Sequence, residues 1–128
     1  MDEQHGKVLI VDDDPVLLEA LGELVGAWGY VPVLASGPGD AIRIFESDPD
    51  IRLIVSDHNM SPLTGIQMIA RLRRMDRRFE AIIFSAGRPE RLIAAAAVFG
   101  IRKIVTKPDY HWLREELAAA AIALDMNP

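Results

Sequence analysis

The acidic pair Asp12 and Asp13 and the separate Asp57 are the residues of this sequence whose types and positions best suit chemistry. Each follows a short apolar run: Lys7–Val11 (KVLIV) precedes the pair, and Leu53–Ser56 (LIVS) precedes Asp57. Such runs are typical of strands buried on both faces of a sheet. Parallel strands of this kind end at one edge, where ligands bind. Three carboxylates would repel one another there unless a cation lay between them, and oxygen ligands with positions left for water and phosphate suit Mg²⁺.

A hydroxyl and an ammonium group follow two further apolar runs. Ser85 comes after residues 81–84 (AIIF), and Lys107 comes shortly after residues 101–105 (IRKIV). Taken singly, an aspartate before a helix more often caps it, and a lone serine or lysine after a strand more often belongs to a turn or to the surface. Asp14 is assigned to such a cap. The carboxylates, the hydroxyl and the ammonium group each follow a predicted strand and are expected at the same edge of the sheet. This coincidence favours a functional site.

The elements that must position these groups alternate along the chain. The expected strands are residues 7–11, 31–35, 53–56, 81–84 and 101–105, and the expected helices are residues 16–28, 38–45, 65–75, 89–99 and 110–124. Five strands, each followed by a helix, predict an α/β fold with a parallel sheet, helices on both faces and right-handed connections. Pro32 places the second strand near an edge. The residues expected to face inward on the first helix are Leu17, Leu21, Leu24 and Trp28, with Gly29 ending it.

Composition narrows the function classes. The 128 residues are 50% hydrophobic and 26% charged, which is typical of a globular protein. We expect one domain, residues 1–128, with polar tails at 1–6 and 125–128. The net charge of −5 argues against a nucleic-acid surface. The basic segment 71–79 (RLRRMDRRF) is interpreted as a solvated helix end.

Cysteine usage and hydropathy exclude further classes. The chain has no cysteine, which excludes a disulfide framework, a thiolate metal site and a cysteine nucleophile. The polar N-terminus (MDEQHGK) and the lack of a long apolar run predict neither a signal peptide nor a membrane span. We therefore expect a cytoplasmic protein.

Four segments resemble the receiver domain of two-component response regulators. They are VLIVDDDP (8–15), SDHNMSPLTG (56–65), FSAG (84–87) and VTKP (105–108), and the resemblance covers essentially the whole chain. It implies a flavodoxin-like (βα)5 fold whose five-stranded parallel sheet has the order 2-1-3-4-5. It also implies a phosphoprotein of two-component signal transduction or a phosphorelay, acting as a switch rather than as an enzyme with turnover.

In that family an aspartate at the end of the third strand accepts a phosphoryl group from a histidine kinase or a histidine phosphotransfer protein. The matching residue here is Asp57. The acid pair that holds Mg²⁺ maps to Asp12 and Asp13, with Asp57 and the backbone carbonyl of Asn59 as further ligands. A carboxylate is a weak nucleophile, so the metal would neutralise it and align the incoming phosphorus.

The groups that would contact the phosphoryl group map to Ser85 and Lys107. Related receivers hold the bond after this lysine cis, here the bond from Lys107 to Pro108, which is an option specific to proline. Asn59 and Gly87 lie where related receivers tune hydrolysis of the acyl phosphate. The resemblance thus assigns each matching residue a distinct role.

The sequence departs from the family pattern in two places. The proline usually found four residues after the acceptor falls one later, so Ser61 precedes Pro62. Three residues before Lys107, related receivers commonly carry a Tyr or Phe ring that turns inward on phosphorylation, whereas this chain has Ile104. An aliphatic side chain cannot act as that ring. We therefore expect segment 85–99, which offers little side-chain anchoring, to move instead.

The resemblance also implies a partner surface, made by the last two helices and the fifth strand. Ile104, Tyr110 and Trp112 lie there, and an effector protein or a second copy of the chain could dock on it. Only DMNP follows Leu124, so we expect no output domain and no DNA binding by this chain. Either a stand-alone receiver or a piece of a larger hybrid kinase or regulator fits.

Three other functions stay open at this point. A degenerate receiver could serve as a phosphate-independent protein-binding module, and lack of Mg²⁺ binding would favour it. A phosphohydrolase with an aspartate nucleophile would resemble a DxDxT pattern, but His58 and Asn59 follow Asp57. A flavin carrier would need a Ser/Thr/Gly-rich phosphate loop after the first strand, where this chain has acids.

Overall fold

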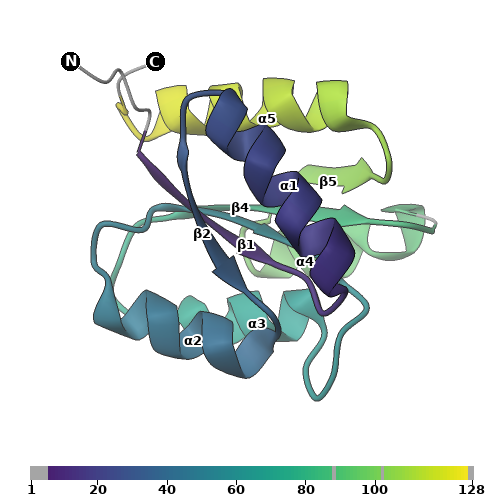
Figure 1. The fold of residues 1–128 in the computed structure, drawn as a ribbon. Helices are drawn as coiled ribbons and strands as arrows, with labels where there is room; N and C mark the ends of the chain where they lie inside the picture. Colours follow the sequence, from purple (N-terminus) through teal and green to yellow (C-terminus); the bar gives the residue numbers. More distant parts are fainter. Residues whose placement is uncertain (1–5, 88, 102, 127–128) are drawn as a thin grey trace.

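A computed structural model describes residues 6–87, 89–101 and 103–126. Its strands are β1 (Lys7–Val11), β2 (Val31–Ala35), β3 (Leu53–Ser56), β4 (Glu80–Ser85) and β5 (Lys103–Thr106). Its helices are α1 (Pro15–Ala27), α2 (Pro38–Ser47), α3 (Gly65–Leu72), α4 (Ile93–Val98) and α5 (Tyr110–Ala123), with a 3-10 turn η1 (Pro89–Arg91). The strands form one parallel sheet in the order β2-β1-β3-β4-β5 (Figure 1). This order confirms the predicted fold class.

Helices cover both faces of the sheet, and each face has its own core. On one face α1 and α5 pack against the sheet, with Leu21 and Leu117 buried beside Val55 (Figure 1). On the other face α2 and α3 contribute Phe45 and Ile69 to a second buried cluster. β1 and β3 are the central strands, and every residue of β3 is buried. Burial on both faces explains why their sequences are continuous apolar runs rather than alternating patterns.

The register of the central strands brings their carboxyl ends level. Val11 pairs with Ser56, so that Asp12 and Asp57 leave the sheet side by side. The amide of Asp57 continues the ladder by donating to the carbonyl of Val11 at 2.9 Å. One edge of the sheet therefore collects the polar residues that follow the strands, as the topology predicts.

The inward face of α1 differs from the predicted one. The predicted set was Leu17, Leu21, Leu24 and Trp28, whereas the buried residues are Leu18, Leu21, Gly22 and Val25. Leu17 is 38% exposed. Gly22 faces Leu34 of β2, where a Cβ at residue 22 would lie 2.9 Å from a methyl of Leu34, and Trp28 packs partly buried against the core that contains Leu21. The prediction of Gly29 as the stop agrees with its φ of 102°.

The region between β4 and β5 also differs from the expected single helix over 89–99. It contains the η1 turn and then α4, which spans only Ile93–Val98 and buries only Ala96. With so little apolar surface to bury, the segment gains little from extending the helix. β5 begins at Lys103 rather than at residue 101, and Arg102 lies outside the described residues. α3 ends at Leu72, three residues before the predicted end.

The basic segment 71–79 is only in part the solvated helix end that its composition indicated: Arg71, Arg74 and Arg78 are exposed, whereas Arg73 and Arg77 are partly buried. Arg77 lies over the ring of Phe45 at 3.7 Å and donates to the carbonyls of Phe45, Asp48 and Ile51. Arg73 is likewise partly buried. Both guanidinium groups satisfy carbonyls at the ends of other elements, which is a structural role.

Two further predictions concern the polar tails and the absence of a membrane span. The expected polar tails at 1–6 and 125–128 fall largely on residues 1–5 and 127–128, outside the described residues. Among the residues that the structure describes, no helix is long and apolar enough to cross a membrane.

Candidate functional site

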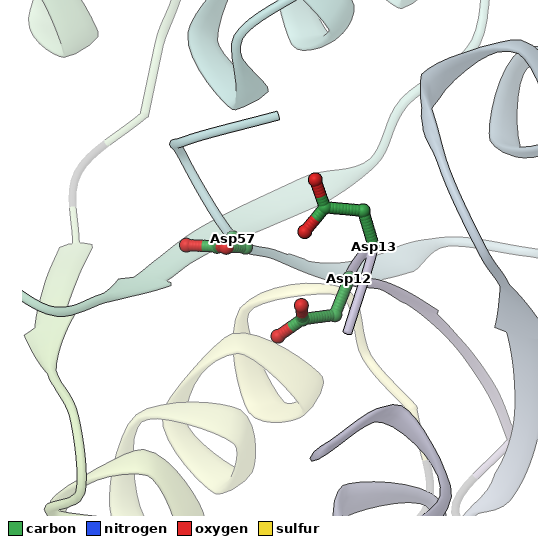
Figure 2. A group of neighbouring side chains, drawn as sticks. All are labelled: Asp12, Asp13 and Asp57. Atoms are coloured by element: carbon green, nitrogen blue, oxygen red, sulfur yellow. The ribbon is translucent and has the colours of Figure 1, made fainter. Parts of the chain in front are cut away.

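Three carboxylates meet at the carboxyl ends of the two central strands. Asp12 and Asp13 follow β1, and Asp57 follows β3 (Figure 2). One oxygen from each of the three residues lies within 4.8 Å of the others. Asp12 is buried, Asp57 is half-buried and Asp13 is exposed, so the cluster opens toward solvent on one side. The spatial convergence is the one that the strand order predicts.

Asp12 is fixed by two donors. Its Oδ1 accepts from the backbone N–H of Asp14 at 2.9 Å, and its Oδ2 accepts from the ammonium of Lys107 at 2.8 Å. Asp14 in turn caps α1, accepting from the amides of Val16 and Leu17, as predicted. The start of α1 therefore holds the backbone beside the acid pair in place.

Lys107 brings a positive charge into the acidic cluster. Its Nζ lies 2.8 Å from Asp12 and 3.8 Å from Asp57, and its side chain is only 17% exposed. The ammonium also lies 5.9 Å from the ring centre of Phe84, on β4. The backbone N–H of Lys107 donates to the carbonyl of Ser85, and the peptide bond to Pro108 is cis. The end of β5 thus supplies the counter-charge to carboxylates from β1 and β3.

The loop after β3 is braced by its own hydrogen bonds and by α3. Asp57 Oδ1 accepts from the amide of His58 at 2.8 Å, and the carbonyl of Asp57 accepts from the hydroxyl of Ser56 at 2.7 Å. The amide of Gly65 donates to the carbonyl of His58 at 2.8 Å. A Cβ at residue 65 would lie 2.3 Å from the carbonyl oxygen of Asp57. Gly65 is therefore a positioning residue whose role residue type alone did not reveal.

His58 is half-buried in this loop. Burial lowers the pKa of its imidazole, and the nearby Asp57 carboxylate raises it by a smaller amount. Its Nδ1 is buried with no hydrogen-bond partner among the described residues. The lowered pKa favours the neutral imidazole, so His58 does not add a second cation beside Lys107.

The remaining predicted residues lie around the cluster rather than within it. Ser85 is buried at the end of β4, and its hydroxyl donates locally to the carbonyl of Ala86 at 3.3 Å. Asn59 is exposed two residues beyond Asp57, and Gly87 is exposed with a φ of 105°. Ile104 is half-buried on β5 and lines an apolar groove with Trp112.

The residues present fit a divalent cation. Carboxylate oxygens are the ligands that Mg²⁺ prefers, and their placement at a solvent-open edge leaves room for water and a phosphoryl oxygen. The ammonium of Lys107 lies close to two of these carboxylates, Asp12 and Asp57, and offsets part of their negative charge. One lysine cannot balance three carboxylates, which leaves a net negative site for a metal.

The sequence has relatives among response regulators. Residues 8–120 match the response regulator receiver domain family. The chain is 30% identical to the transcriptional regulatory protein GlrR of Escherichia coli over 108 residues, covering 84% of this chain and 24% of GlrR. It is 32% identical to the two-component response regulator PprB of Pseudomonas aeruginosa, covering 82% of this chain and 39% of PprB. The chain therefore spans well under half the length of these two relatives.

Relatives of similar size and solved structures are also similar. A probable chemotaxis protein CheY of Rhizobium etli is 30% identical over 105 residues, covering 80% of this chain and 81% of that protein. A response regulator receiver protein from Pseudomonas putida superposes with a TM-score of 0.82 at 27% identity, over 89% of this chain and 96% of that one.

The response regulator TrrA of Thermotoga maritima, crystallised with Mg²⁺-BeF, shares the fold with a TM-score of 0.80 at 22% identity. It covers 90% of this chain and 98% of its own. The sheet order, the acidic edge and the match over residues 8–120 lead to one conclusion. The chain belongs to the response regulator receiver domain family.

Proposed function

We propose that the chain is a phosphoacceptor switch that takes a phosphoryl group onto the carboxylate of Asp57. The arrangement that carries this proposal is the placing of Asp57, 12% exposed, beside Asp12, Asp13 and Lys107. A lone aspartate at a strand end has many explanations, whereas an accessible carboxylate among two further acids and an ammonium fits phosphoryl chemistry. The donor is the phosphohistidine of a histidine kinase or a phosphotransfer protein.

The transfer forms one bond and breaks one. A carboxylate oxygen of Asp57 attacks phosphorus, the bond from phosphorus to the donor's imidazole nitrogen breaks, and the imidazole leaves with the electron pair and takes up a proton. The backbone N–H of His58 holds the carboxylate orientation through Asp57 Oδ1. Phosphoryl transfer depends on positioning and charge stabilisation more than on covalent help from the protein.

Charge stabilisation comes from groups on three strand ends. Bound Mg²⁺, held by Asp12, Asp13, Asp57 and the backbone carbonyl of Asn59, would neutralise the carboxylates and polarise the phosphoryl group. The presence of Mg²⁺-BeF in the related TrrA supports this cofactor. Lys107 lies close enough to Asp57 to bind a second phosphoryl oxygen.

The product would be an acyl phosphate, which water hydrolyses. Ser85 would turn its hydroxyl from the carbonyl of Ala86 to the phosphoryl group, and Asn59 and Gly87 would tune the hydrolysis. The chain then acts as a switch with slow self-dephosphorylation rather than as an enzyme with turnover. It acts in the cytoplasm through protein partners, an effector or a second copy docking on α4, β5 and α5, and it does not bind DNA.

A phosphate-independent protein-binding module is the second candidate. One observation favours it: β5 carries Ile104 in place of a ring, and an apolar groove is open beside it in the unphosphorylated protein. The complete acidic cluster favours the phosphoacceptor. In the binding-module alternative, removal of Mg²⁺ would leave partner binding unchanged.

The deciding experiment is intact-mass analysis after incubation with acetyl phosphate, with and without Mg²⁺, on the wild type and on Asp57→Asn. We expect a metal-dependent gain of one phosphoryl group that is lost in the variant and removed by hydroxylamine, which cleaves acyl phosphates. A purified histidine phosphotransfer protein serves as a second donor. Absence of any gain with both donors, while Mg²⁺ fails to bind, would select the binding module.

A further inference from the structure

The helix α4 is held loosely along most of its length. Ala96 is its single buried residue, and Ile93 and Val98 are 57% and 76% exposed. Its N-cap residue, Leu92, makes no side-chain capping bond. Because few buried contacts resist displacement, this helix lies at the low-stability end of the fold.

The carboxyl end of α4 is an exception, because Arg73 holds it. Arg73 Nε donates to the carbonyl of Phe99 at 2.8 Å, and its Nη2 donates to the carbonyl of Gly100 at 3.3 Å. Its Nη1 donates to the carbonyl of Phe79 at 2.7 Å, and the guanidinium lies 3.9 Å from the ring centre of Phe79. One planar side chain thus ties the turn between α4 and β5 to the start of β4. Lysine, with a single ammonium, cannot reproduce this three-way fork.

Arg73 is the C-cap residue of α3. The other end of α3 is attached to the loop after β3 that contains Asp57. There Gly65 packs against the carbonyl of Asp57 and donates to His58. A capping box between Thr64 and Gln67 and a largely buried inner face make α3 a firm element. A single helix therefore connects the loop that carries Asp57 to the turn that ends α4.

That turn borders the apolar groove of about 760 Å³ on the partner-facing side of the molecule. Gly100 and Ile101 from the turn, Ile93 from α4, Ile104 from β5 and Trp112 from α5 all line the groove. Any rotation of α4 about the turn changes the distance between Ile93 and Trp112, and with it the shape of the groove.

We propose that Arg73 is a fixed pivot for α4: it pins the carboxyl end of the helix to α3, so that occupancy of the Asp57 site swings the amino end and reshapes the apolar groove. This inference rests on the proposed function and adds which end of α4 stays fixed while the site controls the partner surface. It gives the chain a switch that needs no aromatic ring at position 104, because the moving part is the helix and the fixed part is the guanidinium of Arg73.

The first test needs no phosphoryl group. Residue-resolved amide exchange by NMR is compared between the wild type, Arg73→Gln, Arg73→Lys and the matched control Arg74→Gln, whose side chain is exposed on the neighbouring position. The reporting amides are those of Phe99, Gly100 and Ile101, which donate to carbonyls in the last turn of α4. We expect exchange about tenfold or more faster in both Arg73 variants and unchanged in Arg74→Gln.

Central-strand amides serve as the folding control in each variant. If they also exchange faster in Arg73→Gln, the comparison uses Arg73→Lys, which keeps the charge and removes only the fork. Equal exchange at the turn in Arg73→Lys and Arg74→Gln would overturn the pivot.

The second test adds Mg²⁺ and beryllium fluoride as a phosphoryl mimic. In the wild type we expect exchange at Ala96, whose amide closes the first turn of α4 onto Leu92, to change about threefold or more, while the three turn amides stay constant. In Arg73→Lys the change should spread to the turn amides. A wild-type response as large at the turn as at Ala96 would refute the pivot, whereas no response anywhere would speak against the phosphoacceptor function and leave the first test standing.

Discussion

Lys107 illustrates at the scale of one residue how the acidic edge is balanced in the protein alone. The side chain bridges the buried Asp12 and the half-buried Asp57, which follow different strands. Removing one partner from a largely buried ion pair leaves an uncompensated charge, and this is costly because the remaining carboxylate cannot be fully hydrated. The site residue is therefore also a stabilising residue.

We expect Lys107→Ala to lower the free energy of unfolding by about 2–4 kcal/mol in metal-free buffer, with part of the loss recovered on addition of Mg²⁺. Arg43→Ala is the control, because Arg43 in α2 and its ion-pair partner Asp40 are 74% and 41% exposed. Its removal should cost about 1 kcal/mol or less. Urea unfolding with and without Mg²⁺ measures both. An equal cost for the two variants would contradict the role of Lys107.

At the scale of the element, α3 can begin at Gly65 because glycine permits close contact with the loop after β3 that contains Asp57. A methyl group at residue 65 would lie 2.3 Å from the carbonyl oxygen of Asp57, so the loop or the helix must shift. Gly65→Ala should cost about 2–3 kcal/mol of stability and weaken Mg²⁺ binding, since the shift moves Asp57. Both quantities follow from urea unfolding and calorimetric titration.

Gly39→Ala in α2 is the control for that substitution. Nothing lies within 4 Å of a Cβ at residue 39, and alanine is favoured over glycine in helices by about 1 kcal/mol. This variant should therefore be slightly stabilised, with unchanged metal affinity. If Gly65→Ala behaved in the same way, close packing of α3 on the loop that contains Asp57 would not constrain the acidic cluster.

The elements also show which parts of the fold a sequence can predict. The parallel sheet and the meeting of Asp12, Asp13 and Asp57 follow from local signals, because buried parallel strands read as apolar runs and end at one edge, whereas the strand order followed only from the resemblance to receiver domains. The inward face of α1 did not follow, since Leu17 and Leu18 are both apolar and the sequence alone does not show which of them is buried. Gly22 on the buried face lies against Leu34 of β2, a contact between residues from different elements.

The burial of Arg73 and Arg77 within segment 71–79 did not follow from the sequence for the same reason, whereas Arg71, Arg74 and Arg78 are exposed as predicted. The carbonyl acceptors of Arg73 at Phe99 and Gly100 lie 26 and 27 positions away in sequence. A basic composition at a helix end indicates side chains that are exposed to solvent. Only the tertiary structure reveals the backbone carbonyls that accept hydrogen bonds from these arginines. The short length of α4 did not follow from the sequence, because the high helix propensity of an alanine run does not reveal how little apolar surface the helix buries.

At the scale of the whole molecule, the metal site should contribute to global stability. A ligand that binds only the folded state at ten times its Kd adds about 1.4 kcal/mol to the free energy of unfolding. We expect Mg²⁺ to raise the midpoint of thermal unfolding of the wild type and to lose most of this effect in Asp13→Asn. Asp50→Asn, which alters an exposed carboxylate outside the cluster, is the control. Identical Mg²⁺ responses in the two variants would argue against the assigned site.

The position of Lys107 in the chain has a consequence for biosynthesis. The ribosome releases β1, β2 and β3 before β5, and every carboxylate of the cluster follows β1 or β3, whereas Lys107, which forms ion pairs with Asp12 and Asp57, is fifty residues beyond Asp57. Until β5 is synthesised, the chain therefore carries all three carboxylates of the cluster without the ammonium of Lys107, and we expect the edge of the sheet to close only when β5 is added as the last strand.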